Sequence, residues 1–361
     1  MSSENNEIVL EVELPDPYIS TYSVNYIKEG ARFHIIITGE WMRKLKNCSL
    51  VHIQGNTYSA KEEPLEPLIE AFKKKYGSSH LDFHDMLSGT AFLLEKTDKP
   101  IRNRYEILER EFDEVSKNYE SSIKGNPVEV YMRDRTSLIL SRFAKDGMNV
   151  LEIGCGTLME AAAIRSMVHL TCAELSNEMI VKAQENSKSI HNIEFETLKV
   201  STGIVKTDKK YDILFTTFGY LDLENIETIE NTLRENLRPG GIFIGAFWNR
   251  FGFLDILISL LLGRGKYVKQ KIRGNVLPDF SRFTTATIPK GPNELFKMKG
   301  FSKVKKVGVC TVIPPYNFSS IAKRLINKKV LFRMDTLASS LPFIKNFADY
   351  IIVVLRRENG P

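Results

Sequence analysis

From residue 149 onward, short apolar runs alternate with amphipathic stretches in a regular order. The apolar runs predict buried strands at 149–153, 169–173, 193–198, 211–217 and 241–247. The stretches between them carry apolar residues at helical spacing and predict helices at 158–167, 177–187 and 223–237. This alternation is typical of a parallel sheet covered by helices on both faces. The expected fold class is therefore α/β, with a doubly wound, Rossmann-like sheet.

The pattern continues on both sides of this region. Two helices, at 101–124 and 128–143, precede the first strand, and a helix at 293–299 with strands at 303–310 and 350–355 completes a mostly parallel seven-stranded sheet. Helical insertions at about 250–290 and 312–349 interrupt it. The whole of 100–361 is therefore expected to form one domain.

Residues 1–99 read as a separate small α+β module. Alternating apolar and polar residues predict strands at 8–14, 32–38 and 50–53, and helical patterns cover 65–76 and 82–94. The sequence Asp98-Lys99-Pro100 marks the expected boundary.

Composition adds few constraints. The net charge of +6 permits an anionic partner but identifies none. The cysteines Cys48, Cys155, Cys172 and Cys310 include no Cys-x-x-Cys pair, which argues against a disulfide framework and a zinc site and fits a reducing cytoplasm. No metal site is expected. The longest apolar run, 251–262, is shorter than the ~20 residues that span a bilayer.

The turn after the first strand of the alternation has the features of a cofactor site. Gly154 and Gly156 allow close approach of the backbone to a ligand, but Met159 stands where a dinucleotide fingerprint has its third glycine. Glu152 before the turn would repel a pyrophosphate and could bind an ammonium group. Glu174, at the end of the next strand, could accept from two ribose hydroxyls. An amino-acid cation and an unphosphorylated ribose together describe S-adenosylmethionine.

Five segments resemble the class I S-adenosylmethionine-dependent methyltransferases. The stretch 151–157 (Leu-Glu-Ile-Gly-Cys-Gly-Thr) is similar to their motif I, and 173–180, 211–214 and 237–243 are similar to later motifs. The lead-in at 112–119 resembles that of the ubiquinone/menaquinone-type subgroup.

The resemblance implies a set of cofactor contacts. Gly154, Cys155 and Gly156 would approach the methionine and ribose moieties, Glu152 the amino group and Glu174 the ribose hydroxyls. The other implied contacts are Leu175 on the adenine, Tyr119 and Arg135 over the methionine carboxylate, and Phe218 beneath the sulfonium. Three positions depart from the family pattern. Leu158 replaces a glycine, Lys199 occupies the place of an acid that contacts the adenine amine, and Glu174 stands where aspartate is commoner.

The two insertions bear on the methyl acceptor. An apolar run followed by basic residues, over 251–273, is typical of a peripheral membrane contact or of a lid over a hydrophobic substrate. Packing in the core and a dimer contact remain as alternatives. The second insertion is also rich in large apolar and basic residues, so together they favour a lipophilic, isoprenoid- or quinone-like acceptor.

The sequence therefore predicts a methyltransferase in the cytoplasm or peripheral at the inner membrane surface. Methyl transfer needs alignment more than acid–base groups, and Tyr220, Asp222 and Tyr316 are candidate bases by position only. The alternatives are a catalytically silent methyltransferase fold that serves as a binding or scaffold subunit, and an RNA or protein methyltransferase. Nucleic acid is the less favoured partner, and a homo-oligomer is left open.

Overall fold

The computed structural model describes residues 7–13, 19–38, 42, 45, 50–53, 56–77, 86–98, 104–198, 204–217, 220–274, 277–278, 286–315, 318 and 328–359. These form two compact units. The first comprises the described residues up to Glu111, and the second those from Phe112 onward.

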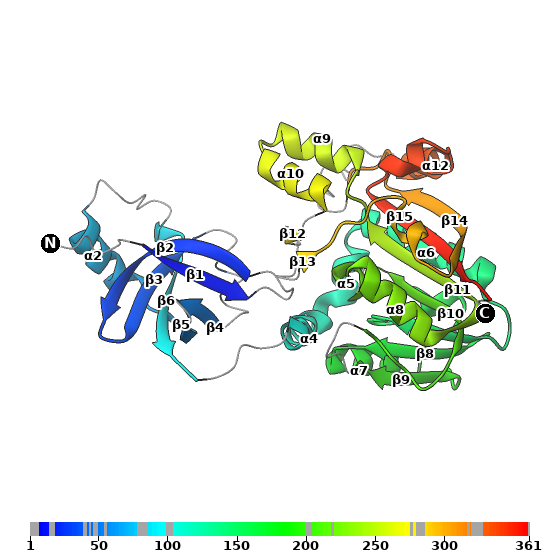
Figure 1. Ribbon diagram of the computed structural model, residues 1–361, viewed down its shortest axis with the longest axis horizontal. Coiled ribbons are helices and arrows are strands. Elements are labelled where there is room, and N and C mark those ends of the chain that lie inside the picture. Colours follow the sequence, from blue (N-terminus) through cyan, green and yellow to red (C-terminus); the bar gives the residue numbers. More distant parts are fainter. Residues whose placement is uncertain are drawn as a thin grey trace. The chain divides into compact units, whose positions relative to one another are not determined.

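The first unit is a closed antiparallel barrel with a helix beside it (Figure 1). Its strands, in barrel order, are β1 (Glu7–Glu13), β2 (Ile19–Glu29), β3 (Arg32–Ile37), β6 (Thr90–Lys96), β5 (Asn56–Glu63) and β4 (Leu50–Ile53). Leu10, Ile35 and Leu94 are fully buried in its interior. The helix α2 (Leu65–Tyr76) packs on the outside through Leu68, Ile69 and Phe72.

One element of this unit was predicted wrongly. The helix expected at 82–94 is a strand from Thr90 onward, and residues 82–85 lie outside the described part of the chain. Strand pairing decides the conformation, because β6 hydrogen-bonds to β3 on one side and β5 on the other. Phe92 and Leu94 then alternate into the barrel, while Ala91 faces the α2 cluster.

The second unit contains the predicted sheet. In strand order it reads β14 (Phe301–Val309), β15 (Tyr350–Arg357), β11 (Leu237–Trp248), β10 (Tyr211–Thr217), β7 (Asn149–Ile153), β8 (His169–Glu174) and β9 (Ile193–Thr197). The five strands from β11 to β9 are parallel, and β15 runs antiparallel to both β11 and β14. The doubly wound, mostly parallel sheet is confirmed.

Helices cover both faces of this sheet (Figure 1). They include α5 (Tyr119–Lys124), α6 (Pro127–Phe143), α7 (Asn177–Asn186) and α8 (Ile226–Asn236). The helix α4 (Arg104–Val115) precedes α5, and the boundary between the two units falls within it. The long helix α6 buries Met132, Ile139 and Leu140 in the same cluster as Ile213 and Phe215 of β10. Asn126 caps its first turn by accepting from the backbone N–H groups of residues 128 and 129.

Two predicted helices of this unit are wrong. The helix expected at 158–167 is a single 3₁₀ turn, η2 (Ala161–Ala163), and the one expected at 293–299 is also only a 3₁₀ turn, η4 (Glu294–Lys297). In the first, Leu158 has a left-handed backbone (φ 64°), which is incompatible with an α-helix at that residue. The alanine-rich pattern alone could not show this.

The cysteine pattern argued against a disulfide framework, but one disulfide is present. Cys155 and Cys172 form a disulfide, with Cα atoms 5.5 Å apart. Cys155 follows β7, and Cys172 lies on β8, which pairs with β7, so neighbouring strands bring the two residues together. The spacing of the cysteines along the chain could not reveal this pairing. The disulfide removes the support that the cysteine pattern gave to a reducing compartment.

The first insertion contains α9 (Phe253–Leu261), α10 (Gly265–Arg273) and the short strands β12 (Leu277–Pro278) and β13 (Ala286–Thr287). A buried ion network attaches its helices to the sheet. Lys271 of α10 is fully buried and lies between Asp255 of α9 and Asp349 just before β15. Tyr267 also donates to Asp255 (2.8 Å), and the Lys271 ammonium lies 4.5 Å from the ring centroid of Trp248.

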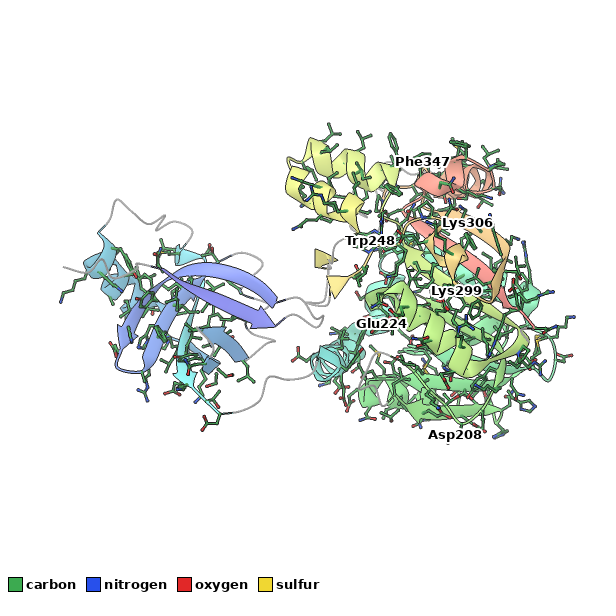
Figure 2. All side chains as sticks on the ribbon, viewed as in Figure 1. Asp208, Glu224, Trp248, Lys299, Lys306 and Phe347 are labelled. Carbon is green, nitrogen blue, oxygen red and sulfur yellow. A yellow bond between two sulfur atoms is a disulfide. The ribbon has the colours of Figure 1, made fainter. Side chains whose placement is uncertain are left out.

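The second insertion contains α12 (Lys328–Ala338) and η6 (Ile344–Phe347). Its anchor is the fully buried Asp335, whose carboxylate accepts from the backbone N–H groups of Cys310, Thr311 and Val312. Figure 2 labels Trp248, where β11 ends before the first insertion, and Phe347, where η6 ends. Within the described ranges, no helix is long and apolar enough to cross a membrane.

Replacing Lys271 tests the buried network. Lys271→Ala leaves the carboxylates of Asp255 and Asp349 buried without their cation, so we expect a loss of about 3–5 kcal/mol in the free energy of unfolding. The control is Lys269→Ala on the exposed side of the same helix, for which we expect a change within about 0.5 kcal/mol. Urea unfolding measures both, and equal losses in the two variants would contradict the assignment.

Candidate cofactor site

The turn after β7 has three residues with a left-handed backbone. They are Gly154 (φ 72°), Gly156 (φ 51°) and Leu158 (φ 64°). The glycines adopt this conformation freely, whereas a leucine there costs roughly 1–3 kcal/mol. Leu158 is only 1% exposed and packs in the main core, and burying a leucine gains about 1.5–3 kcal/mol, which offsets that cost. The departure from the family's glycine is therefore compatible with the same turn.

Glu174 binds this turn to the end of the neighbouring strand. Its Oε2 accepts from the N–H of Gly156 (2.8 Å), and its Oε1 accepts from the N–H groups of Leu175 (2.8 Å) and Ser176 (3.3 Å). Burial raises the pKa of the carboxyl, and these three hydrogen bonds oppose that shift. An ionised carboxylate has about four acceptor positions, so a site remains for a ligand hydroxyl.

Glu152 is an acidic side chain of the site in an unusual, buried environment. The side chain is 2% exposed, and its Oε2 has no hydrogen-bond partner among the described residues. Burial raises its pKa well above the ordinary value, nearby Glu174 raises it further, and Arg133 opposes the shift. A buried acceptor without a partner at the carboxyl end of a strand fits a cationic ligand group, such as an amino-acid ammonium.

Tyr119 and Arg133 cover the other side of the turn. A Cβ added to Gly156 would meet the Tyr119 ring at 3.5 Å, so this ring lies directly against the turn. Arg133 donates to the Tyr119 hydroxyl (3.0 Å) and forms ion pairs with Glu160 and Glu129. Arg135, the arginine expected here, instead lines a pocket with β14, because it lies two residues further along α6 on a different face.

The lead-in segment is joined to the second-strand motif. Asp113 of α4 accepts from the Ser176 hydroxyl (2.5 Å) and from the N–H of Glu178 (3.4 Å) at the start of α7. Ser176 in turn caps α7 by accepting from the N–H of Met179. Leu175, expected at the adenine, is buried at 6% exposure directly after Glu174. Cys155, also expected at the cofactor, points into the core through its disulfide.

The remaining candidates divide into two groups. Asp222 is buried and accepts from the N–H of Trp248 (3.3 Å), while its carbonyl accepts from Lys290 (3.0 Å), so its contacts hold loops together. Lys199, Phe218 and Tyr316 lie outside the described residues, and of Tyr220 only the backbone is described, in the 3₁₀ turn η3 (Tyr220–Leu223).

Residues 144–252 match the family described as "Methyltransferase domain". The chain contains a class I S-adenosylmethionine-dependent methyltransferase domain. It is similar to "Uncharacterized protein MJ1252" of Methanocaldococcus jannaschii, with 26% identity over 263 residues that cover 68% of this chain and 89% of that protein. It is also similar to malonyl-[acyl-carrier protein] O-methyltransferase 2 of Ilyobacter polytropus, with 22% identity over 156 residues (42% of this chain and 58% of that protein).

Among solved structures, the methyltransferase resembles phosphoethanolamine N-methyltransferase 2 of Haemonchus contortus in complex with S-adenosyl-L-methionine. The identity is 14%, the TM-score is 0.48, and the match covers 89% of this chain and 75% of that one.

Sequence reasoning missed three residues near the methyltransferase turn. Arg133 and Glu160 form the buried ion pair beside Tyr119, and Thr217 at the end of β10 has a buried hydroxyl without a hydrogen-bond partner among the described atoms. The signal for Thr217 was its place at the carboxyl end of a central strand, where ligands of open α/β sheets bind.

Replacing Glu152 tests its buried charge. Because its pKa is higher in the folded state, the native protein binds more protons than the unfolded chain between the unfolded and folded pKa values. Its contribution to stability is therefore present below the unfolded pKa and is lost as the pH rises through the folded pKa. Glu152→Gln removes this loss, so the ligand-free variant should gain stability over the wild type as the pH rises from about 5 to about 8.

Urea unfolding across that range measures the difference, and exposed Glu114→Gln on α4 serves as the control that should follow the wild type. A difference between Glu152→Gln and wild type that stays constant with pH would refute the buried charge.

Proposed function

We propose that this methyltransferase transfers the methyl group of S-adenosylmethionine to a lipophilic small molecule of isoprenoid- or quinone-like character, taken up at the two insertions. The acceptor reaches the reacting methyl group from an apolar surface of the insertions, which also contacts the membrane from which the acceptor is drawn. The cofactor supplies an electrophilic methyl group on a sulfonium, and the chain supplies alignment and a water-poor site.

The main support for this proposal is that the amphipathicity of α9 is the reverse of that of a helix packed on a core. The helix buries its polar residues Asp255 and Ser259 and exposes apolar ones. Leu261, for example, is 78% exposed, and the same surface includes Phe253, Leu257, Leu260 and Leu262. Helices that pack on a core do the opposite, so this apolar surface supports an encounter with an apolar substrate or a membrane.

The second insertion has the same property. Leu337 at the end of α12 is 71% exposed and Phe343 is 77% exposed, and Leu341 and Phe347 are exposed as well.

The first insertion also carries exposed cations, Lys269 and Arg273 on α10. Apolar side chains beside cations are the combination that binds anionic membrane surfaces.

Topology puts both insertions at the cofactor edge of the sheet. The first begins where β11 ends, and β11 is parallel to β7, whose carboxyl end carries the glycine turn. The second begins after β14 and ends where the antiparallel β15 starts, which is the same edge. An acceptor held by the insertions would therefore approach from the side on which the turn presents its ligand.

The residues of the turn would hold the cofactor. We assign Glu152 to the ammonium group, because it has a buried carboxylate oxygen without a partner among the described residues. We assign Glu174 to the ribose, because its carboxylate retains one acceptor position for a hydroxyl. Gly154 and Gly156 keep the backbone open to the ligand, and Tyr119 covers Gly156. Thr217 supplies a further hydroxyl at the end of β10.

The acceptor class is tested by incubating the full chain with methyl-labelled S-adenosylmethionine and fractionated cell extract. We expect label in the lipid fraction. The double variant Leu260→Ser/Leu261→Ser should lose at least about tenfold in kcat/KM for that acceptor, roughly 1.4 kcal/mol, without a change in cofactor affinity. The control is Val181→Ser, which replaces an exposed apolar residue on α7.

Label in RNA or protein fractions, or equal losses in the control and the double variant, would overturn the lipophilic acceptor.

A further inference from the structure

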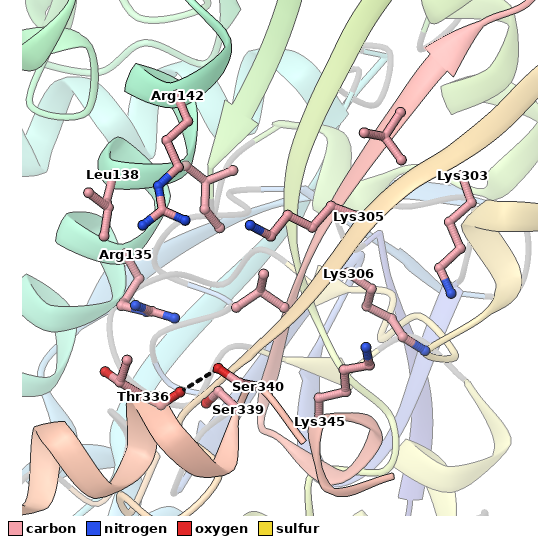
Figure 3. Close-up of a pocket in the computed structure, with 13 residues that line it drawn as sticks. Arg135, Leu138, Arg142, Lys303, Lys305, Lys306, Thr336, Ser339, Ser340 and Lys345 are labelled. Carbon is pink, nitrogen blue, oxygen red and sulfur yellow. Dashed lines mark hydrogen bonds between the residues drawn. The ribbon is translucent and has the colours of Figure 1, made fainter. Parts of the chain in front are cut away.

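A cavity of about 440 Å³ opens on the second unit between α6, β14, α12 and η6 (Figure 3). Its lining contains no aspartate or glutamate. It contains six cations: Arg135, Arg142, Lys303, Lys305, Lys306 and Lys345. Such a volume is within the range of small-molecule sites, and it exceeds what a single phosphate group needs.

The cations converge from three separate elements. Arg135 and Arg142 are seven residues apart on α6 and therefore lie on one face of that helix. The register of β14 on β15 shifts between Lys303 and Lys305, an irregularity that re-aims side chains on a strand. Lys345 is contributed by η6. Figure 3 shows Arg135, Arg142 and Lys305 pointing toward one another, with Lys306 and Lys345 side by side.

Carboxylates do not offset these charges among the described residues, and the aromatic contacts are those of Lys303 and Lys306 with the Phe296 ring (4.9 and 5.7 Å to its centroid). In the described ranges, none of the six forms an ion pair with a carboxylate, and the Nε of Arg135 is buried without a hydrogen-bond partner. Lys306 is 7% exposed and donates only to neutral oxygens, those of Asn293 (2.7 Å), Asn346 (2.6 Å) and the Pro292 carbonyl (3.2 Å). Burial, with Lys303 and Lys345 nearby, lowers the pKa of Lys306 to about 8.

Protection of a sheet edge explains only part of this arrangement. Edge strands such as β14 often carry lysines that prevent pairing with another chain. That function needs neither the arginines of α6 nor Lys345, and it does not need them to face the same cavity. Convergence of like charges is destabilising by itself and is relieved by a bound anion.

We propose that this pocket binds the phosphate groups of a small anionic ligand, either a soluble phosphate ester or the headgroup of an anionic phospholipid. Guanidinium groups match phosphate oxygens in bidentate geometry. Thr336 and Ser340 also line the cavity, and their hydroxyls donate to the backbone carbonyls of Phe332 and Thr336. The cations gather around one concave pocket, which favours a compact anion over a nucleic acid, because a nucleic acid requires an extended basic stripe. The site does not depend on the identity of the methyl acceptor.

Calorimetry with inorganic pyrophosphate on the full chain tests the pocket. We expect saturable binding that weakens as salt increases, and at least tenfold weaker binding in Arg142→Gln/Lys305→Gln. The matched control, Lys182→Gln/Lys206→Gln, makes the same change in net charge at exposed lysines outside the pocket and should remain within twofold of wild type. Unchanged S-adenosylhomocysteine affinity in all three proteins shows that each is folded.

Flotation with vesicles of phosphatidylglycerol and phosphatidylcholine separates the two sources. Vesicle binding that the pocket variant loses and the control keeps identifies a headgroup, whereas pyrophosphate binding without vesicle binding identifies a soluble ester; both support the pocket. The proposal is overturned if pyrophosphate does not bind saturably, if the control loses as much as the pocket variant, or if only a single-stranded RNA binds through these residues.

Discussion

The carboxylate of Glu174 connects the parts of the methyltransferase site. By accepting from the N–H groups of Gly156, Leu175 and Ser176, it fixes the glycine turn after β7 against the end of β8. The Ser176 hydroxyl caps α7 by accepting from the N–H of Met179 and donates to Asp113 of α4. Three segments that are distant in sequence therefore meet at residues 174–176. Next to this turn, Glu152 has a buried carboxylate oxygen without a hydrogen-bond partner among the described residues.

The two insertions are attached to the rest of the second unit in a similar way. Each is attached through buried aspartates, Asp255 and Asp349 around Lys271 in the first, and Asp335 in the second. Other apolar residues of both insertions are exposed, among them Leu261 in the first and Phe343 in the second. In α9, the face that carries Asp255 and Ser259 is buried, and the opposite face exposes apolar side chains.

Sequence periodicity was sufficient for the parallel strands, because strands buried on both faces read as continuous apolar runs. It failed where tertiary contacts override local pattern. The apolar pattern of residues 90–96 fits a helix as well as a strand, and only hydrogen bonding to β3 and β5 decides the conformation. The left-handed Leu158 interrupts a good helical composition after the turn, and no pattern at 158–167 indicates it.

The sequence could predict those site residues whose backbone positions are determined by the motifs. The glycines, Glu152 and Glu174 are brought together by the strand ends that carry them. The structure does not bring Arg135 to this turn. The rotation of α6 about its axis decides which of its two nearby arginines faces the turn, and that residue is Arg133. The disulfide and the basic pocket were also hidden, since both arise between elements that are apart in the chain.

The central claim is that Glu152 receives the cofactor's ammonium group. Calorimetric titration with S-adenosylhomocysteine in two buffers of different ionisation enthalpy tests it, because it counts the protons exchanged on binding. A bound ammonium favours the ionised carboxylate and lowers its raised pKa, so binding should release protons, and Glu152→Gln should abolish that release. Binding without proton release, or release that is unchanged in Glu152→Gln, would contradict the account.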